Sequence, residues 1–300
     1  MELNGVINLY KEKGFTSHDA IAVLRGILKV KKIGHTGTLD PDATGVLPVC
    51  VGKATKVAQL IMGSDKEYIA ELAFGSETDT QDASGKVLQT FDYEYDPRKV
   101  EEAVQSFAGS YDQVPPMYSA LKVGGMKLYE LAREGMEVER ASRTVQIQEI
   151  ALLAQSAAGA KIRVRCSKGT YIRTLCEDIG RQLGYGAHML SLERVQTGPY
   201  RVEDSYRIDE IRTLQQQGRS AEFLQDLNAL FMDLAVKQVI PEEDILLRNG
   251  NYLTYPAAEV GAQMGQVFRM QTSDGKLAGL YRVTELLGEQ TRLRAYKMFV

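Results

Sequence analysis

The hydrophobic and polar positions in the first part of the chain alternate between short apolar runs and polar loops. Residues 5–10 are mostly apolar and predict a short strand. Between Ser17 and Lys29 the apolar residues recur every three or four positions, which predicts a helix with Ser17 as its N-cap. Residues 46–51 are apolar on both faces and predict a buried strand, although the proline at position 48 disfavours one.

The alternation continues up to a pair of prolines. Residues 54–61 predict a helix, and residues 67–74 alternate as in a strand with one wet face. Asp96 and Pro97 open a helix that extends to about Phe107. The prolines at 115 and 116 then interrupt the chain.

Beyond these prolines the pattern becomes irregular. Residues 117–138 mix cations, glycines and helix formers, which fits either a projecting, partly mobile insertion or a surface helix with its turn. Residues 145–153 and 161–166 predict a hairpin, and residues 170–183 a helix. Because strands and helices interleave in irregular order, we expect a mixed α/β sheet rather than a strict βαβ repeat.

The character of the pattern changes after Val239. Pro241 and the two acids that follow it predict a helix start. Short strands are predicted at 266–270, 277–283 and 293–298, with a turn at 273–275. This pattern is typical of a small β-barrel that forms a C-terminal domain.

Composition narrows the class of protein. The 300 residues are 44% hydrophobic, enough for one large domain and one small one, and no apolar run reaches the length of a membrane-spanning helix. The first residues lack a secretory signal pattern. The three cysteines form no CxxC pair, and the three histidines lack metal-ligand spacing, so we expect no metal, no disulfide framework and a cytoplasmic location.

Charge is segregated along the chain although the net charge is only −3. Residues 63–114 hold twelve acidic and four basic side chains, whereas residues 161–201 hold eight basic and three acidic ones. A protein with this distribution can present a basic face to phosphates. On the charge counts alone, the favoured interpretation is that these cations are scattered over solvated strand and helix faces.

The glycine-rich run at residues 34–45 is the strongest candidate for chemistry. It lacks both the Gly-Lys-Ser/Thr ending of a phosphate loop and GxGxxG spacing, and the chain has no GxSxG elbow. Pro41 holds Asp40 away from helical backbone angles, and Asp42 follows two residues later. An aspartate before proline is also a common turn residue, so this pattern alone leaves the role of Asp40 open.

A second cluster, residues 167–173, contains Tyr171 and Arg173, which point to the same side if the segment is extended. A nearby arginine keeps a carboxylate ionised, and a tyrosine offers both a flat face for a base and a hydroxyl. Arg173 could equally form an ordinary ion pair at a helix start.

Six segments in order carry a resemblance to a known family. Residues 34–45 resemble the GHxGxLDPxAtG motif of bacterial tRNA pseudouridine synthases of the TruB type. The resemblance continues at 66–68, 113–122, 128–133, 166–173 and 186–194. One position departs from the pattern, because Glu12 follows Lys11 where the family usually has proline. From this we expect weaker pre-organisation of the turn but no loss of activity.

The resemblance implies a role for each matching residue. Asp40 matches the essential aspartate that labilises the target uridine, and Arg173 matches its arginine partner. Tyr68 matches the tyrosine that stacks on the target base and moves a proton. The other expected substrate or RNA contacts are Tyr171 and Leu192 in the uracil pocket, His35 in the space left by the flipped nucleotide, and Lys11 and Lys122.

The resemblance also implies a fold and a substrate. The expected fold is α+β, with a mixed, mostly antiparallel sheet in a catalytic domain (1–236), a thumb-like RNA-contacting insertion (115–143) and a small PUA-like β-barrel domain (237–300). The expected reaction converts uridine 55 in the T-arm loop of tRNA to pseudouridine by base flipping, without a cofactor, a guide RNA or a membrane, in a monomer. Two alternatives are a non-catalytic RNA-binding or RNA-folding protein and a synthase that acts on ribosomal or small nuclear RNA.

Overall fold

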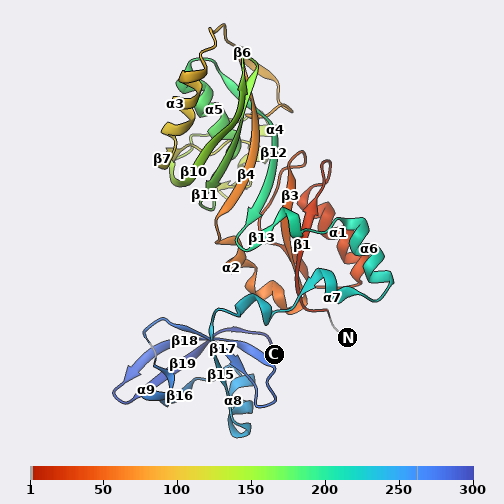
Figure 1. Ribbon diagram of the computed structural model, residues 1–300, viewed down its shortest axis with the longest axis vertical. Coiled ribbons are helices and arrows are strands. Elements are labelled where there is room, and N and C mark those ends of the chain that lie inside the picture. Colours follow the sequence, from red (N-terminus) through yellow and green to blue (C-terminus); the bar gives the residue numbers. More distant parts are fainter. Residues whose placement is uncertain (1–2, 262) are drawn as a thin grey trace.

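The computed structural model describes residues 3–261 and 263–300, and its main body is one mixed sheet with helices packed against it (Figure 1). From edge to edge, its strands are β14 (Leu224–Gln225), β1 (Gly5–Lys11), β3 (Thr44–Val51), β12 (Ala187–Thr197), β4 (Lys66–Phe74), β11 (Gly159–Cys166), β10 (Arg143–Ser156) and β7 (Gly109–Gln113). Two short strands pair beside this path, β2 (Ile33–His35) with β3 and β13 (Tyr200–Arg201) with β12.

The sheet is mostly antiparallel, as expected. In its described part, only β12 and β3 run parallel. This parallel pair brings residues 193–194 beside residues 44–45, so the end of β12 meets the glycine-rich loop. Pro48 does not interrupt β3, and the predictions of strands at 5–10, 46–51 and 67–74 and of the 145–166 hairpin are confirmed.

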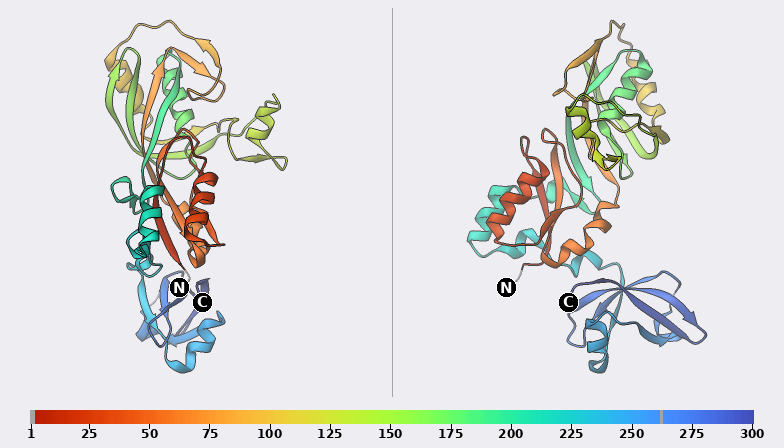
Figure 2. Two further views of the ribbon diagram at one scale, coloured as in Figure 1. Left: turned by 90° about the vertical axis from the view of Figure 1, so that its right-hand side faces the viewer. Right: turned by 180° about the vertical axis from the view of Figure 1, so that it is seen from behind.

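Helices cover the sheet in two groups (Figures 1 and 2). Helices α1 (Ser17–Leu28) and α6 (Ile208–Gln216) pack on each other, with α1 against β2 and α6 against β1. Helices α3 (Pro97–Ser106) and α5 (Ile172–Leu183) pack on each other, on β10 and on β12. The shorter elements of the body are the 3₁₀ turns η1 (Gly52–Val57), η2 (Val202–Asp204) and η3 (Ala229–Phe231), helices α2 (Ala58–Met62) and α7 (Ser220–Phe223), and strands β5 (Ser76–Thr78) and β6 (Val87–Thr90).

Two local predictions need correction. The N-cap of α1 is Thr16, whose hydroxyl accepts a hydrogen bond from the amide of Asp19 at 3.0 Å, while the Ser17 hydroxyl bonds elsewhere. Residues 54–61 form a 3₁₀ turn followed by a short α-helix. The helix predicted at 170–183 is confirmed: Tyr171 is the N-cap of α5 and Arg173 lies in its first turn, so the two residues do not share an extended segment.

The predicted insertion forms a small unit of its own. It contains the hairpin β8 (Lys122–Val123) and β9 (Met126–Lys127) and helix α4 (Leu128–Arg133). Figure 2 shows this yellow-green segment projecting sideways from the body. Of the two alternatives for residues 117–138, the projecting insertion therefore describes the fold.

The C-terminal strands form a curled, open half-barrel below the main sheet in Figure 1. Its strand order is β15 (Ala235–Gln238), β17 (Val267–Gln271), β18 (Leu277–Leu287), β19 (Gln290–Met298) and β16 (Leu253–Pro256). The 3₁₀ turn η4 (Pro241–Glu243) and helices α8 (Asp244–Arg248) and α9 (Ala257–Val260) connect these strands. The predicted α+β fold with a small C-terminal β domain is confirmed.

One hydrophobic cluster joins the half-barrel to the main body. Val46, Cys50 and Val57 of the body are buried together with Leu280 and Phe299 of the C-terminal part. The half-barrel thus shares a buried cluster with the main body, and its strand β19 contacts the 3₁₀ turn η1. A separate, larger cluster fills the space between the main sheet and its helices.

Candidate active site

Asp40 lies in the loop that joins β2 to β3. The loop starts where the amide of Thr36 donates to the carbonyl of Pro48 at 3.0 Å, and it turns tightly where the amide of Ala43 donates to the carbonyl of Asp40 at 3.1 Å. The Asp40 side chain is 40% exposed. A substrate can therefore reach a carboxylate whose backbone is fixed.

The turn at residues 11–17 holds the chain on both sides of Asp40. The Ser17 hydroxyl accepts from the amide of Leu39 at 2.9 Å and lies 3.1 Å from its carbonyl, to which it donates. The Lys11 ammonium and the amide of Gly14 both donate to the carbonyl of Pro41, at 3.1 and 3.0 Å. The two neighbours of Asp40 are thus tied to one turn.

Lys11 is fully buried, and this position changes its expected role. Its ammonium also donates to the carbonyls of Glu12 at 3.1 Å and Phe15 at 2.6 Å, and its burial lowers its pKa to about 8. With no exposed surface, the side chain cannot contact RNA in this conformation. Lys11 acts as an internal clamp on three backbone carbonyls.

Arg194 clamps the loop from the opposite side. This arginine of β12 is 2% exposed, and its guanidinium donates to the carbonyls of Val46 at 2.7 Å, Gly37 at 3.2 Å and Thr38 at 3.5 Å. Gly45 permits this approach, because a Cβ there would lie 2.3 Å from the carbonyl oxygen of Arg194. The sequence analysis counted Arg194 only as a basic residue. Its burial could have been predicted, because Arg194 follows Leu192 by two residues and therefore lies on the same face of the strand.

Arg173 joins Asp40 to two other segments. Its Nε lies 3.0 Å from Asp40 Oδ2, and its Nη1 lies 3.7 Å from Asp82 Oδ2 and donates to the carbonyl of Thr80 at 3.1 Å. Its Nη2 donates to the carbonyl of Tyr118, at the base of the insertion, at 2.9 Å. The Arg173 side chain is only 7% exposed. Asp82, which the sequence analysis missed, is the second carboxylate beside this guanidinium.

Tyr68 and Leu192 lie in neighbouring strands beside this pair. Tyr68 of β4 is opposite Arg194 of β12, and Leu192 is opposite Ala70 in the same register. Both side chains are about nine-tenths buried and belong to the cluster that also contains Leu39. Burial raises the pKa of the Tyr68 hydroxyl, and the Arg194 guanidinium opposes this shift, so the phenol is neutral at pH 7.

The remaining residues predicted to contact substrate or RNA are Tyr171, His35 and Lys122. Tyr171 is half-buried at the start of α5, where Gln113 exchanges two hydrogen bonds with its backbone at 2.8 and 3.0 Å. His35 is half-buried and packs edge-on against His18 with ring centroids 5.5 Å apart; burial lowers its pKa. Lys122 is exposed on the projecting hairpin.

The basic stretch at 161–201 does not form one continuous face. Antiparallel pairing of β11 with β4 puts Lys161 3.0 Å from Glu71 and Arg163 3.5 Å from Glu67. The other neutralised or buried cations are Arg173, Arg181 and Arg194. Within the described part of this stretch, the exposed cations without an ion pair are Arg165, Lys168 and Arg201. The expected RNA face is therefore sparser than the charge count indicated.

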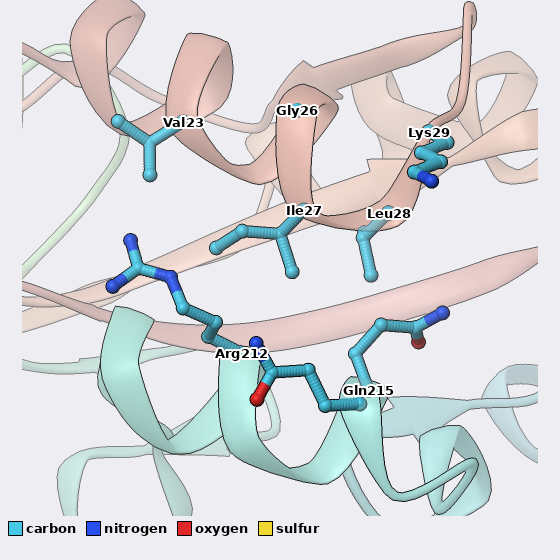
Figure 3. A pocket seen from close by; sticks show the side chains of 8 residues that line it. Val23, Gly26, Ile27, Leu28, Lys29, Arg212 and Gln215 are labelled. Carbon is cyan, nitrogen blue, oxygen red and sulfur yellow. The ribbon is translucent and has the colours of Figure 1, made fainter.

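Other candidate features lie outside this centre. Asp42 is 66% exposed and lies 3.9 Å from the Lys13 ammonium, so only Asp40 of the two loop aspartates is paired with Arg173. A groove of about 590 Å³ lies between α1 and α6, lined by Ile27, Arg212 and Gln215 among others (Figure 3). None of its lining residues belongs to the Asp40 centre.

The described residues, 3–261 and 263–300, hold neither a cluster of metal ligands nor a membrane-spanning helix. They contain no group of three or more histidine, cysteine or acidic side chains arranged to hold a metal ion. They also contain no helix long and apolar enough to cross a membrane. The three cysteines are all free and buried.

The arrangement offers an accessible carboxylate held by a buried guanidinium, next to a neutral phenol and apolar side chains. Such a centre can bind a flat, uncharged group such as a nucleobase and present an ionised oxygen to it. The fixed backbone around Asp40 limits its movement during a reaction.

Comparison with known proteins agrees with this geometry. A family model for the "TruB family pseudouridylate synthase (N terminal domain)" matches residues 25–172, and one for the "tRNA pseudouridylate synthase B C-terminal domain" matches residues 173–235. A protein of Francisella tularensis subsp. tularensis named tRNA pseudouridine synthase B is 42% identical over 85% of both chains. A protein of the same name from Clostridium perfringens is 50% identical over 70% of this chain and 72% of its own.

Solved structures with the same architecture cover nearly the whole chain. A chain from a Cbf5-Nop10-Gar1 complex aligns with a TM-score of 0.73 and 27% identity, covering 99% of this chain and 85% of that one. A chain from an H/ACA ribonucleoprotein bound to a substrate RNA containing 2′-deoxyuridine aligns with a TM-score of 0.72 and 25% identity, with the same coverage. From the matched family models and the extent of these identities, the chain belongs to the TruB family of pseudouridylate synthases.

Proposed function

We propose that this protein is a tRNA pseudouridine synthase that isomerises uridine 55 in the T-arm loop, with Asp40 as its essential carboxylate. The observation that carries the proposal is the 3.0 Å contact between the accessible Asp40 carboxylate and the buried Arg173 guanidinium. The relatives' shared name supports tRNA as the substrate. The loop position within tRNA rests on the resemblance of the motifs.

The reaction is an isomerisation that needs no external reagent. The bond from the ribose to the ring nitrogen of uracil breaks, the base turns, and a bond forms from the ribose to a ring carbon. The proton released from that carbon is balanced by the proton gained at the freed nitrogen. Because atoms and electrons balance within the nucleotide, the reaction consumes no redox or group-carrying cofactor.

The residues around Asp40 have distinct roles in this proposal. Asp40 labilises the target uridine, and Arg173 orients the carboxylate through their 3.0 Å contact. Tyr68 offers an aromatic face to the flipped base and a neutral hydroxyl for proton movement, while Leu192 and Tyr171 line the uracil pocket. His35 occupies the space that the flipped nucleotide leaves. Such an extrahelical base needs aromatic and apolar contacts of this kind.

The more remote parts bind RNA in this proposal. Lys122 and the projecting insertion contact the RNA around the loop, and the half-barrel that begins near residue 237 serves as a PUA-like RNA-binding domain. We propose a monomer that acts without guide RNA. Three buried, unpaired cysteines are compatible with the reducing cytoplasm, which we propose as its location.

Two alternatives remain distinguishable. A purely RNA-binding protein has no need of an accessible carboxylate paired with a buried arginine, so the Asp40–Arg173 pair favours an enzyme. A synthase for ribosomal or small nuclear RNA shares this centre and differs only in substrate. The neighbours in H/ACA and Cbf5 complexes make this second alternative worth testing directly.

The test is incubation of the protein with an unmodified tRNA transcript, followed by mapping of pseudouridine at nucleotide resolution. We expect one modified site, uridine 55, without added RNA or cofactor. A matched transcript with cytidine at position 55 should remain unmodified. Modification at other sites, or only of a ribosomal RNA fragment, contradicts the proposed substrate, and no modification of any RNA contradicts the proposed activity.

A further inference from the structure

Glu12 forms an ion pair that links the turn at 11–17 to a distant part of the chain. Its carboxylate Oε1 lies 2.6 Å from Nη1 of Arg207. Both side chains are partly exposed, at 38% for Glu12 and 54% for Arg207.

Arg207 is a fixed partner rather than a mobile surface side chain. It is the residue just before α6, and its amide donates to the Glu210 carboxylate at 2.7 Å. The preceding residue, Tyr206, exchanges two backbone hydrogen bonds of 2.9 Å with Asn8 and Tyr10 of β1. The Arg207 guanidinium also lies over the Tyr10 ring, 4.6 Å from its centroid. The backbone at Arg207 and its guanidinium are thus each held by contacts that do not involve Glu12.

Tyr10 extends these contacts toward the active-site loop. Its hydroxyl donates to Glu193 at 3.0 Å, and Glu193 directly precedes the loop-clamping Arg194. Glu12, Arg207, Tyr10 and Glu193 therefore form one chain of polar and cation–aromatic contacts. This chain runs from the turn at 11–17 to the end of β12.

The turn that Glu12 belongs to is the one that fixes both neighbours of Asp40. Glu12 lies between Lys11 and Gly14, whose nitrogens both donate to the carbonyl of Pro41. We propose that Glu12, through Arg207, is a positioning residue that holds this turn against the Asp40 loop. The ion pair ties the turn to the residue before α6, and the backbone hydrogen bonds of Tyr206 hold that residue's neighbour on β1. This inference rests on the proposed function for the role of Asp40.

The test is a double-mutant cycle on the full-length protein with unmodified tRNA transcript. The variants are Glu12→Gln, Arg207→Gln, their combination and the charge-swapped Glu12→Lys with Arg207→Glu. Glu222→Gln is the matched control, because it breaks an exposed ion pair with Arg219 that does not contact the loop. The measurements are the single-turnover rate at saturating tRNA, the tRNA dissociation constant and hydrogen exchange at the amides of Gly14 and Leu39.

We expect each single variant to lower the single-turnover rate by about two- to fivefold, as partly exposed pairs allow, with no further loss in the double variant. Exchange at the Gly14 and Leu39 amides should accelerate by a similar factor, with tRNA affinity unchanged. The charge swap restores the ion pair but not the contact of residue 207 with the Tyr10 ring, so it should recover part of both losses, and the control should change neither. Unchanged rates, additive losses in the double variant, or weakened tRNA binding at a constant rate would each overturn the inference.

The two proposals fail in different ways. If the wild-type protein makes no pseudouridine, the proposed function fails, yet exchange at Gly14 and Leu39 still reports whether the pair holds the turn. If the wild type is active and exchange at these amides is the same in every variant, the positioning inference alone is overturned.

Discussion

At the scale of single residues, the charged side chains of this site mostly hold backbone rather than face solvent. Lys11 and Arg194 each donate to three backbone carbonyls, and both are almost completely buried. The sequence shows only their charge, which indicated RNA contacts. Burial of a cation is favourable only with several acceptors around it, and those acceptors come from segments far away in sequence. Asp40 and Arg173, in contrast, were both predicted from their motifs.

Lys11→Met tests this clamp. The variant leaves the carbonyls of Glu12, Phe15 and Pro41 without their donor, so we expect a loss of about 1–3 kcal/mol in the free energy of unfolding and a lower single-turnover rate. Urea denaturation and tRNA-binding measurements check this, with tRNA affinity unchanged. The matched variant Lys122→Gln should do the opposite, weakening tRNA binding in a salt-dependent way without changing stability. A Lys11→Met protein of normal stability and weak tRNA binding contradicts the clamp.

At the scale of secondary structure elements, periodicity predicted most strands and helices to within a few residues. The predictions fail at the ends of elements, where side chains from distant segments fix the backbone. Ser17 was assigned as a cap from local pattern alone, whereas its hydroxyl bonds Leu39 and Thr16 takes the cap. The helix predicted at 170–183 is confirmed as α5, which begins at Ile172, but the pattern did not show that Gln113 holds the backbone of Tyr171 at its start. Arg173 therefore reaches Asp40 from a helix.

Helix α5 also contains an acid whose ionisation is linked to stability. Burial raises the pKa of Glu177 from 4.5 to about 7, against the effect of Arg181, and Glu177 accepts a hydrogen bond from Gln81. The folded state therefore keeps a proton that the unfolded state releases between pH 4.5 and about 7. The free energy of unfolding should fall as pH rises through this window.

Glu177→Gln removes this dependence while keeping the shape of the side chain. We expect the decrease in stability between pH 4.5 and 7 to become smaller by about 1–3 kcal/mol, measured by urea denaturation at several pH values. Asp178, whose pKa is raised to about 6 mainly by burial, supplies the part of the slope that remains. An identical pH profile for both proteins contradicts this account of Glu177.

At the scale of the whole molecule, the shared cluster between the main body and the half-barrel was not predicted. Sequence pattern identifies the strands of each part, but it does not show that Leu280 and Phe299 pack against Val46 and Val57. Such contacts link residues more than two hundred positions apart, and the hydrophobic periodicity of a segment carries no information about them. The half-barrel thus extends the molecule as a unit that shares part of its core with the main body.

Phe299→Ala tests this packing. Phe299 is 2% exposed and stacks on Phe231 with ring centroids 6.0 Å apart, so the variant should lose about 3–5 kcal/mol of stability if the two parts unfold together. We expect weaker tRNA binding and an unchanged rate of reaction for bound tRNA. The contradicting result is that the wild type unfolds in two transitions and Phe299→Ala affects only the first, because the two parts would then unfold independently.

The most direct measurement of the central claim compares Asp40→Asn with Asp42→Asn. Both changes remove one carboxylate from the same loop without altering side-chain size, but only Asp40 contacts Arg173. The assay is single-turnover pseudouridine formation on unmodified tRNA transcript, with tRNA affinity and thermal stability measured in parallel. We predict that Asp40→Asn binds tRNA, stays folded and forms no pseudouridine, while Asp42→Asn reacts like the wild type. Measurable turnover by a folded Asp40→Asn protein would contradict the account.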